Sequence, residues 1–166
     1  GLALGANTLT LSGGGSLVSG GLALDDEDSK LLLNSITVDS VSTSVDNSLG
    51  LDVDDNSIVS SLSVAHITPV SIANTKTLSG AITVTAGSIK LDETGTLASS
   101  ISMSGGTLDA DNSLTVSGTL TQSGNITIDV LTDKMLTYSG TAISLGANTL
   151  TLSGGGSLVS GGLTLD

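Results

Sequence analysis

The chain has 166 residues, of which four are lysine, none is arginine and 16 are acidic, so its formal net charge is −12. This charge excludes nucleic acid and anionic membrane surfaces as partners, since binding to either needs clustered basic residues. It contains no Cys, Phe or Trp, which excludes a disulfide scaffold and favours a narrow core of stacked aliphatic side chains. With 38% apolar residues it is too hydrophobic for a disordered chain, and no apolar run approaches the ~18 residues that span a bilayer.

The sequence of residues 4–25 returns almost unchanged at residues 145–166, with Thr164 in place of Ala23 as the one difference. The two copies are 141 positions apart. A near-identical return at a fixed offset is typical of a structural unit that is copied along a longer array. We therefore interpret residues 1–166 as one continuous segment of a repetitive protein.

Within the first copy, apolar and polar residues alternate in three short segments separated by glycines. Alternation with period two is typical of a β-strand with one buried face, and strands this short need neighbours above and below to bury it. The pattern predicts that the threonines Thr8, Thr10, Thr149 and Thr151 point outward. It predicts inward positions for Leu9, Leu11, Leu17, Leu22, Leu24, Leu150, Leu152, Leu158, Leu163 and Leu165.

The rest of the chain follows the same pattern, for example at residues 82–85, 88–91 and 126–128. Residues 29–34 also fit a helix, although a buried strand explains them equally well. We expect Pro69 at a corner or strand end, because proline removes a ladder donor. The sequence predicts an all-β, parallel β-solenoid with more than 40% strand and almost no helix.

A leucine or isoleucine follows a turn at intervals of 20 to 25 residues, and these positions suggest the length of one coil. The intervals divide the 141-residue repeat into about six coils. At roughly 4.8 Å per coil, one repeat would advance about 29 Å along the axis. The marker residues are Leu4, Leu24, Leu49, Ile72, Leu97, Leu120 and Leu145.

The Thr-Leu-Thr-Leu-Ser-Gly-Gly-Gly pattern of residues 8–15 and 149–156 resembles the passenger repeats of bacterial autotransporters and related giant adhesins. The resemblance is in the pattern of residue types and not in a specific motif, and it extends over nearly the whole chain. It implies a right-handed β-solenoid that is exported to the bacterial cell surface.

Nine of the 16 acidic residues lie between Asp25 and Asp55, which makes this region a candidate calcium site. Calcium needs several convergent oxygen ligands, and stacked corners could supply them. The alternative, which we favour, is a solvated, repulsive edge that blocks sheet aggregation. The candidate ligands are Asp25, Asp26, Asp28, Asp52, Asp54 and Asp55. We expect no other cofactor.

Thr-x-Thr pairs recur along the chain, as at residues 8–10 and 83–85, and stacked rows of such pairs resemble the ice-binding faces of antifreeze solenoids. A threonine-rich outer face is also the default for a soluble solenoid. Catalysis has little support, because His66 is the one histidine and no cysteine could pair with it. We expect no enzyme activity.

The sequence thus favours a structural extracellular fibre or stalk. The alternative is an adhesin that binds a glycan or host protein through a lateral face of the solenoid. Ice binding is the third hypothesis. The partner would be another copy of the unit, stacked head to tail or joined in tandem. The end coils would form the contact, through Leu4, Leu9, Leu11, Leu24, Leu145, Leu150, Leu152 and Leu165.

Overall fold

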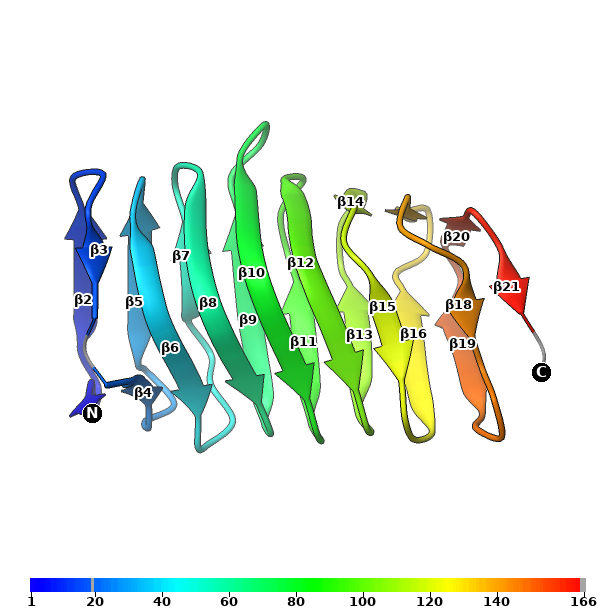
Figure 1. Ribbon diagram of the computed structural model, residues 1–166, viewed down its shortest axis with the longest axis horizontal. Helices are drawn as coiled ribbons and strands as arrows, with labels where there is room; N and C mark the ends of the chain where they lie inside the picture. The colour runs from blue at the N-terminus through cyan, green and yellow to red at the C-terminus, as the bar shows by residue number, and fades with distance from the viewer. Residues whose placement is uncertain (19, 165–166) are drawn as a thin grey trace.

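The computed structural model describes residues 1–18 and 20–164, and in this part of the chain it contains strands and turns with no helix. More than half of the described residues lie in strands, as the sequence predicted. The strands stack into a single column of coils, with the N-terminus at one end of the column and the C-terminus at the other (Figure 1). Every strand pair is parallel. The fold is therefore a parallel β-solenoid of about eight turns.

Two long sheets and one short sheet form the walls of the solenoid. The first sheet contains β1 (Leu2–Ala3), β3 (Ser16–Leu17), β4 (Leu22–Leu24), β6 (Thr37–Thr43), β8 (Ser57–Val64), β10 (Thr77–Val84), β12 (Thr96–Met103), β14 (Leu114–Val116), β15 (Leu120–Gln122), β17 (Met135–Tyr138) and β20 (Ser157–Ser160). The second contains β2 (Thr8–Ser12), β5 (Lys30–Asn34), β7 (Gly50–Val53), β9 (Ile67–Ile72), β11 (Ser88–Leu91), β13 (Thr107–Ala110), β16 (Ile126–Val130) and β19 (Leu150–Gly154). The short sheet pairs β18 (Ile143–Ser144) with β21 (Leu163–Thr164).

The core is a narrow stack of aliphatic side chains between the first and second sheets. Inward residues alternate with outward ones along each strand, so that Leu31 and Leu33 on β5 are completely buried while Leu32 between them is not. Leu, Ile and Val of one coil lie directly over those of the next, because the strands pair in register. Stacking like on like fills the interior without large aromatic rings.

The inward leucines of the repeated segment behave differently at the two ends of the column. Leu22 and Leu24 are buried, while Leu163 is 51% exposed although its sequence context is almost the same. The difference is one of neighbours: β4 lies between β1 and β6, but β21 pairs with β18 alone. Leu9, Leu11, Leu17, Leu150 and Leu158 are half-buried against the core, and Leu165 lies outside the described residues.

Leu152 is 57% exposed, although it pairs in register with buried Ile128 and so occupies an inward column. It lies on the last strand of the second sheet, where no further coil covers it. Thr8, Thr10, Thr149 and Thr151 are exposed, as predicted. The predicted register is therefore confirmed, and the exposure of individual leucines depends on their distance from the ends.

The prediction of six coils per repeat is wrong, because one repeat contains seven coils. The register partners from Leu2 run through Leu22, Val41, Leu62, Ile82 and Ile101 to Leu120, in steps of 19 to 21 residues. One further coil reaches Ile143, 141 positions after Leu2. At the usual strand spacing, seven coils advance about 34 Å.

The marker residues gave the wrong count because they do not lie in one column. Ile72 lies on β9 of the second sheet, whereas Leu97 lies on β12 of the first. Residues on two different walls cannot measure the length of a coil.

Pro69 is also not where it was expected, since it lies inside β9 and pairs in register with Lys90 of β11. The carbonyl of Pro69 lies against the Cα of Gly50, where a side chain would collide with it. Gly50 also has a positive φ of 63°, so glycine is required there for two reasons. A glycine in the neighbouring coil therefore gives the proline room within the wall.

Candidate functional surfaces

The six carboxylates that were candidate calcium ligands fall into three separate places. Asp25, Asp26 and Asp28 lie in the corner between β4 and β5, where they accept hydrogen bonds from Gly5 N–H (2.8 Å), Asp28 N–H (3.1 Å) and the Ser48 hydroxyl (3.4 Å), respectively. These bonds tie the corner to itself and to the coils on either side.

The other predicted ligands lie on β7 and in the corner after it. Asp52 forms an ion pair with Lys30 of the preceding coil at 2.8 Å, and Asp55 forms one with Lys76 of the following coil at 2.9 Å. The Lys76 contact and the Asn56 N–H lower the pKa of Asp55. Asp54 follows Val53 in the same corner. Among residues 1–18 and 20–164, no three His, Cys, Asp or Glu side chains converge as a metal site would require. The predicted set therefore does not form one site.

A second group of acidic side chains lies on the outer face of the second sheet and was not singled out in the sequence. Asp109 on β13 pairs in register with Lys90 on one side and with Asp129 on the other. Lys90 forms an ion pair with Asp111 at 3.0 Å, and the Ser153 hydroxyl donates to Asp129. The pattern was missed because the partners are 19 to 24 positions apart in the sequence and meet only through the coil register.

Burial and mutual repulsion affect the protonation of this group. Partial burial raises the pKa of Asp92 and of Asp109, and the neighbouring Asp111 raises both further. The hydrogen bond to Asp111 raises the pKa of Lys90. Like charges directly opposite each other destabilise a sheet, so this face carries an electrostatic cost that Lys90 only partly offsets.

The outer face of the first sheet carries short hydroxyl side chains in register. One column joins Ser42, Ser63, Thr83, Ser102 and Thr121, which are all exposed. The Thr-x-Thr pairs do not stack into one row, because Thr83 and Thr121 are separated by Ser102, and Thr8 and Thr10 lie on the second sheet beside Lys30 and Leu32. The hydroxyl column is regular in spacing, but it contains three serines and two threonines.

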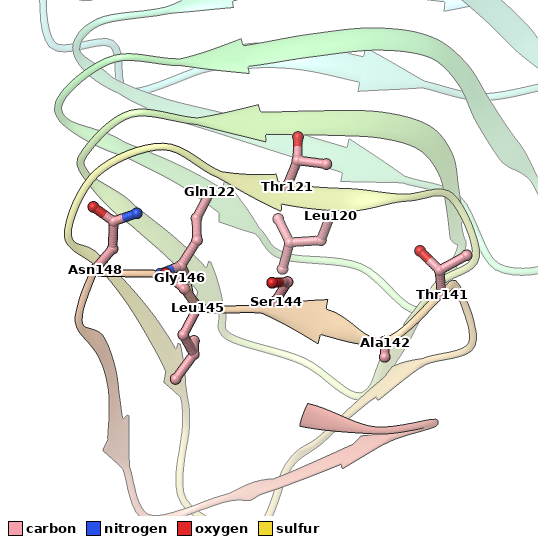
Figure 2. Close-up of a pocket in the computed structure, with 9 residues that line it drawn as sticks. All are labelled: Leu120, Thr121, Gln122, Thr141, Ala142, Ser144, Leu145, Gly146 and Asn148. Atoms are coloured by element: carbon pink, nitrogen blue, oxygen red, sulfur yellow. The ribbon is translucent and has the colours of Figure 1, made fainter. Parts of the chain in front are cut away.

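A shallow pocket of about 220 Å³ lies where β15 and β18 separate (Figure 2). Its lining includes Thr121, Gln122, Ser144 and Asn148, and all nine lining residues come from the segments 120–122 and 141–148. The side chain of Gln122 donates weakly to the Leu145 carbonyl at 3.4 Å, and its buried carbonyl oxygen has no partner.

His66 lies in the turn before β9, with Nδ1 3.6 Å from a carboxylate oxygen of Asp46. That same oxygen accepts the Ile67 N–H at 2.9 Å, so the carboxylate orders this corner. The arrangement organises a turn.

No protein-family model, no curated protein and no solved structure matches this chain. Within the described residues there is also no helix long and apolar enough to cross a membrane. The functional argument therefore rests on the geometry of the solenoid itself.

Proposed function

We propose that this chain is a segment of an extracellular structural fibre or stalk, built from tandem copies of a 141-residue unit. The observation that carries the proposal is the return of residues 4–25 at 145–166, after seven complete coils. A unit that ends on the wall where it began can be followed by another copy in the same direction. Length then increases without any new packing arrangement.

The walls support this role because their hydrogen bonds run along the axis. Backbone bonds join consecutive coils at corners as well as in strands, as in Leu4 N–H to Ala23 O (3.1 Å) and Leu145 N–H to Thr164 O (3.1 Å). The lysine–aspartate pairs 30–52, 76–55 and 90–111 also join neighbouring coils. Tension along the fibre would be shared by many of these backbone hydrogen bonds and ion pairs at once, which suits a protein that must resist extension.

The test is to compare the 166-residue chain with a protein that contains one more copy of residues 4–144, by small-angle X-ray scattering. We expect the long dimension to increase by about 34 Å, with an unchanged radius of gyration of the cross-section. A wider particle of the same length would contradict the fibre. Surface labelling of the source cells with an antibody against the chain tests the extracellular location.

A second candidate is binding through a lateral face, either as an adhesin or at an ice surface. The observation in its favour is the exposed hydroxyl column from Ser42 to Thr121, which repeats at the coil spacing. A regular row suits a repetitive ligand such as a polysaccharide or ordered water. Binding to a glycan array supports a glycan-binding adhesin, thermal hysteresis supports ice binding, and a negative result in both removes these two forms of lateral binding.

A further inference from the structure

One wall of the solenoid is interrupted between two successive coils. The inward column through Ile82, Ile101 and Leu120 is held by pairing of β10 with β12 and of β12 with β15. The next strand along this wall, β18, pairs with β21 and not with β15. Among residues 1–18 and 20–164, no other wall stops and then resumes one coil later. The pocket of about 220 Å³ lies in this interruption (Figure 2).

Backbone groups of β15 face the interruption. The Ser123 N–H donates to the Met103 carbonyl of β12 at 2.9 Å, so the backbone at Ser123 points away from β18. Successive residues of a strand direct their backbone groups to opposite sides, so those of Gln122 point towards β18. In the preceding coils of this wall, the strand facing the next coil pairs with it in register. The ladder of backbone hydrogen bonds is therefore broken at β15.

Tyr138 and the length of the coil account for the interruption. The Leu120 N–H, which also faces away from β12, donates to the buried phenol of Tyr138 at 2.9 Å. The phenol oxygen thus takes the place of a carbonyl from the next strand. Leu120 and Ile143 are 23 positions apart (143 − 120), whereas the earlier steps along this column are 19 to 21. The longer coil gives β18 room to lie apart from β15.

The other two walls continue past the same coils. β13, β16 and β19 pair in register on the second sheet, and β14, β17 and β20 do so on the first sheet. A weak hydrogen bond from the Gln122 side chain to the Leu145 carbonyl, at 3.4 Å, spans the interruption. The two coils are thus held together by backbone ladders on two walls and by no strand pairing on the third.

We propose that the solenoid bends at this interruption: the two continuous walls act as the hinge, and the gap between β15 and β18 opens and closes. Opening here breaks no strand pair, whereas bending between the coils before it would break several backbone hydrogen bonds. The hinge is a property of the single chain. Its role rests on the fibre function proposed above, in which the hinge recurs once per 141-residue unit and divides the fibre into stiff segments of about 34 Å.

The absence of native cysteine allows spin labels to be placed across the interruption. Thr121 and Ser144 are exposed on β15 and β18, so labels on Thr121→Cys and Ser144→Cys report the width of the gap by electron paramagnetic resonance. The matched control is Ser63→Cys with Thr83→Cys, which replaces two exposed register partners in the intact part of the same wall. We expect the distance distribution across the interruption to be broader than that of the control and to extend to longer distances. Equal widths would overturn the hinge.

A disulfide between the same two positions tests whether the bend matters in a fibre. The protein is the 166-residue chain with one more copy of residues 4–144, and each copy carries Thr121→Cys and Ser144→Cys. Oxidation closes the gaps, so we expect small-angle X-ray scattering to give a larger radius of gyration for the oxidised protein than for the reduced one, because the stapled particle is straighter. The disulfide between Ser63→Cys and Thr83→Cys should leave the radius of gyration unchanged.

The outcomes separate the hinge from the fibre. An unchanged radius of gyration on oxidation, or no disulfide between positions 121 and 144, overturns the hinge even if the added copy lengthens the particle by about 34 Å. A particle that does not lengthen overturns the fibre, while the label distances in the single chain still decide the hinge.

Discussion

The hydroxyl of Tyr138 accepts a hydrogen bond from the backbone N–H of Leu120 at 2.9 Å. This contact joins β17 to β15 across the break in the first sheet where β14 ends, and Tyr138 is only 3% exposed. The one aromatic residue of the chain thus supplies an acceptor to a buried strand. A side chain at Gly140 would collide with the backbone carbonyl of Gly118 and with this phenol.

We expect Tyr138→Phe to lower the free energy of unfolding by about 1–3 kcal/mol, because the Leu120 N–H would stay buried without its acceptor. For a chain of this size, each kcal/mol corresponds to about 2–4 °C in Tm. Thermal unfolding followed by circular dichroism at 218 nm measures the shift. An unchanged Tm would show that another group or water satisfies the Leu120 N–H.

The core register predicts a graded response to a buried charge. Leu11 and Leu33 are register partners on β2 and β5, but Leu33 is completely buried and Leu11 is half-buried on the end strand. We expect Leu33→Asp to lower the free energy of unfolding by about 4 kcal/mol or more and Leu11→Asp by clearly less. Urea unfolding of the two variants checks this order, and equal losses would contradict it.

The acidic face of the second sheet predicts a dependence on pH. Because the pKa values of Asp92 and Asp109 are raised in the folded protein, the folded state holds these protons more tightly than the unfolded chain. Their contribution to stability is complete below the ordinary value of 3.8 and is lost as pH rises through the raised values. Asp55 has the opposite effect on the pH dependence of stability. Its pKa is lowered in the folded protein, so its contribution to stability is lost as pH falls through this lowered pKa.

Asp109→Asn should therefore stabilise the protein at pH 7 and have less effect near pH 3.5, below the raised pKa, where the native carboxyl is mostly protonated. Urea midpoints at the two pH values measure this difference. Asp39→Asn, on the exposed side of β6, removes the same charge away from the acidic face and serves as the control. A larger gain for the control than for Asp109→Asn at pH 7 would contradict a local cause.

The sequence predicted the fold and the direction of the side chains because both depend on local alternation. Leu31, Leu32 and Leu33 could have been helical, and the structure places them on β5 with the outer two buried. The coil count, by contrast, depends on which strands share a wall. Ile72 and Leu97 could not reveal this, because leucine and isoleucine serve equally well on either sheet.

The surfaces were harder to predict than the core. Asp109 and Asp129 are 20 residues apart and become direct neighbours only through the register of β13 and β16. The Asp25–Asp55 cluster, close in sequence, is instead divided between corners and a strand, where lysines and backbone amides satisfy it. On a solenoid, spacing of one coil brings side chains together more effectively than closeness in sequence.

Gly80 offers a prediction about the close approach of two coils. It has a φ of 130° and lies at the irregularity between β8 and β10, where a Cβ would overlap the carbonyl oxygen of Val59. We expect Gly80→Ala to lower the free energy of unfolding by at least about 2 kcal/mol, from strain in the backbone and from separation of the two strands. Gly15, which has no positive φ and no atom within 4 Å of the position that a Cβ would take, is the matched control. Gly15→Ala should leave the urea midpoint nearly unchanged, so equal midpoints for the two variants would show that β8 and β10 can move apart at little cost.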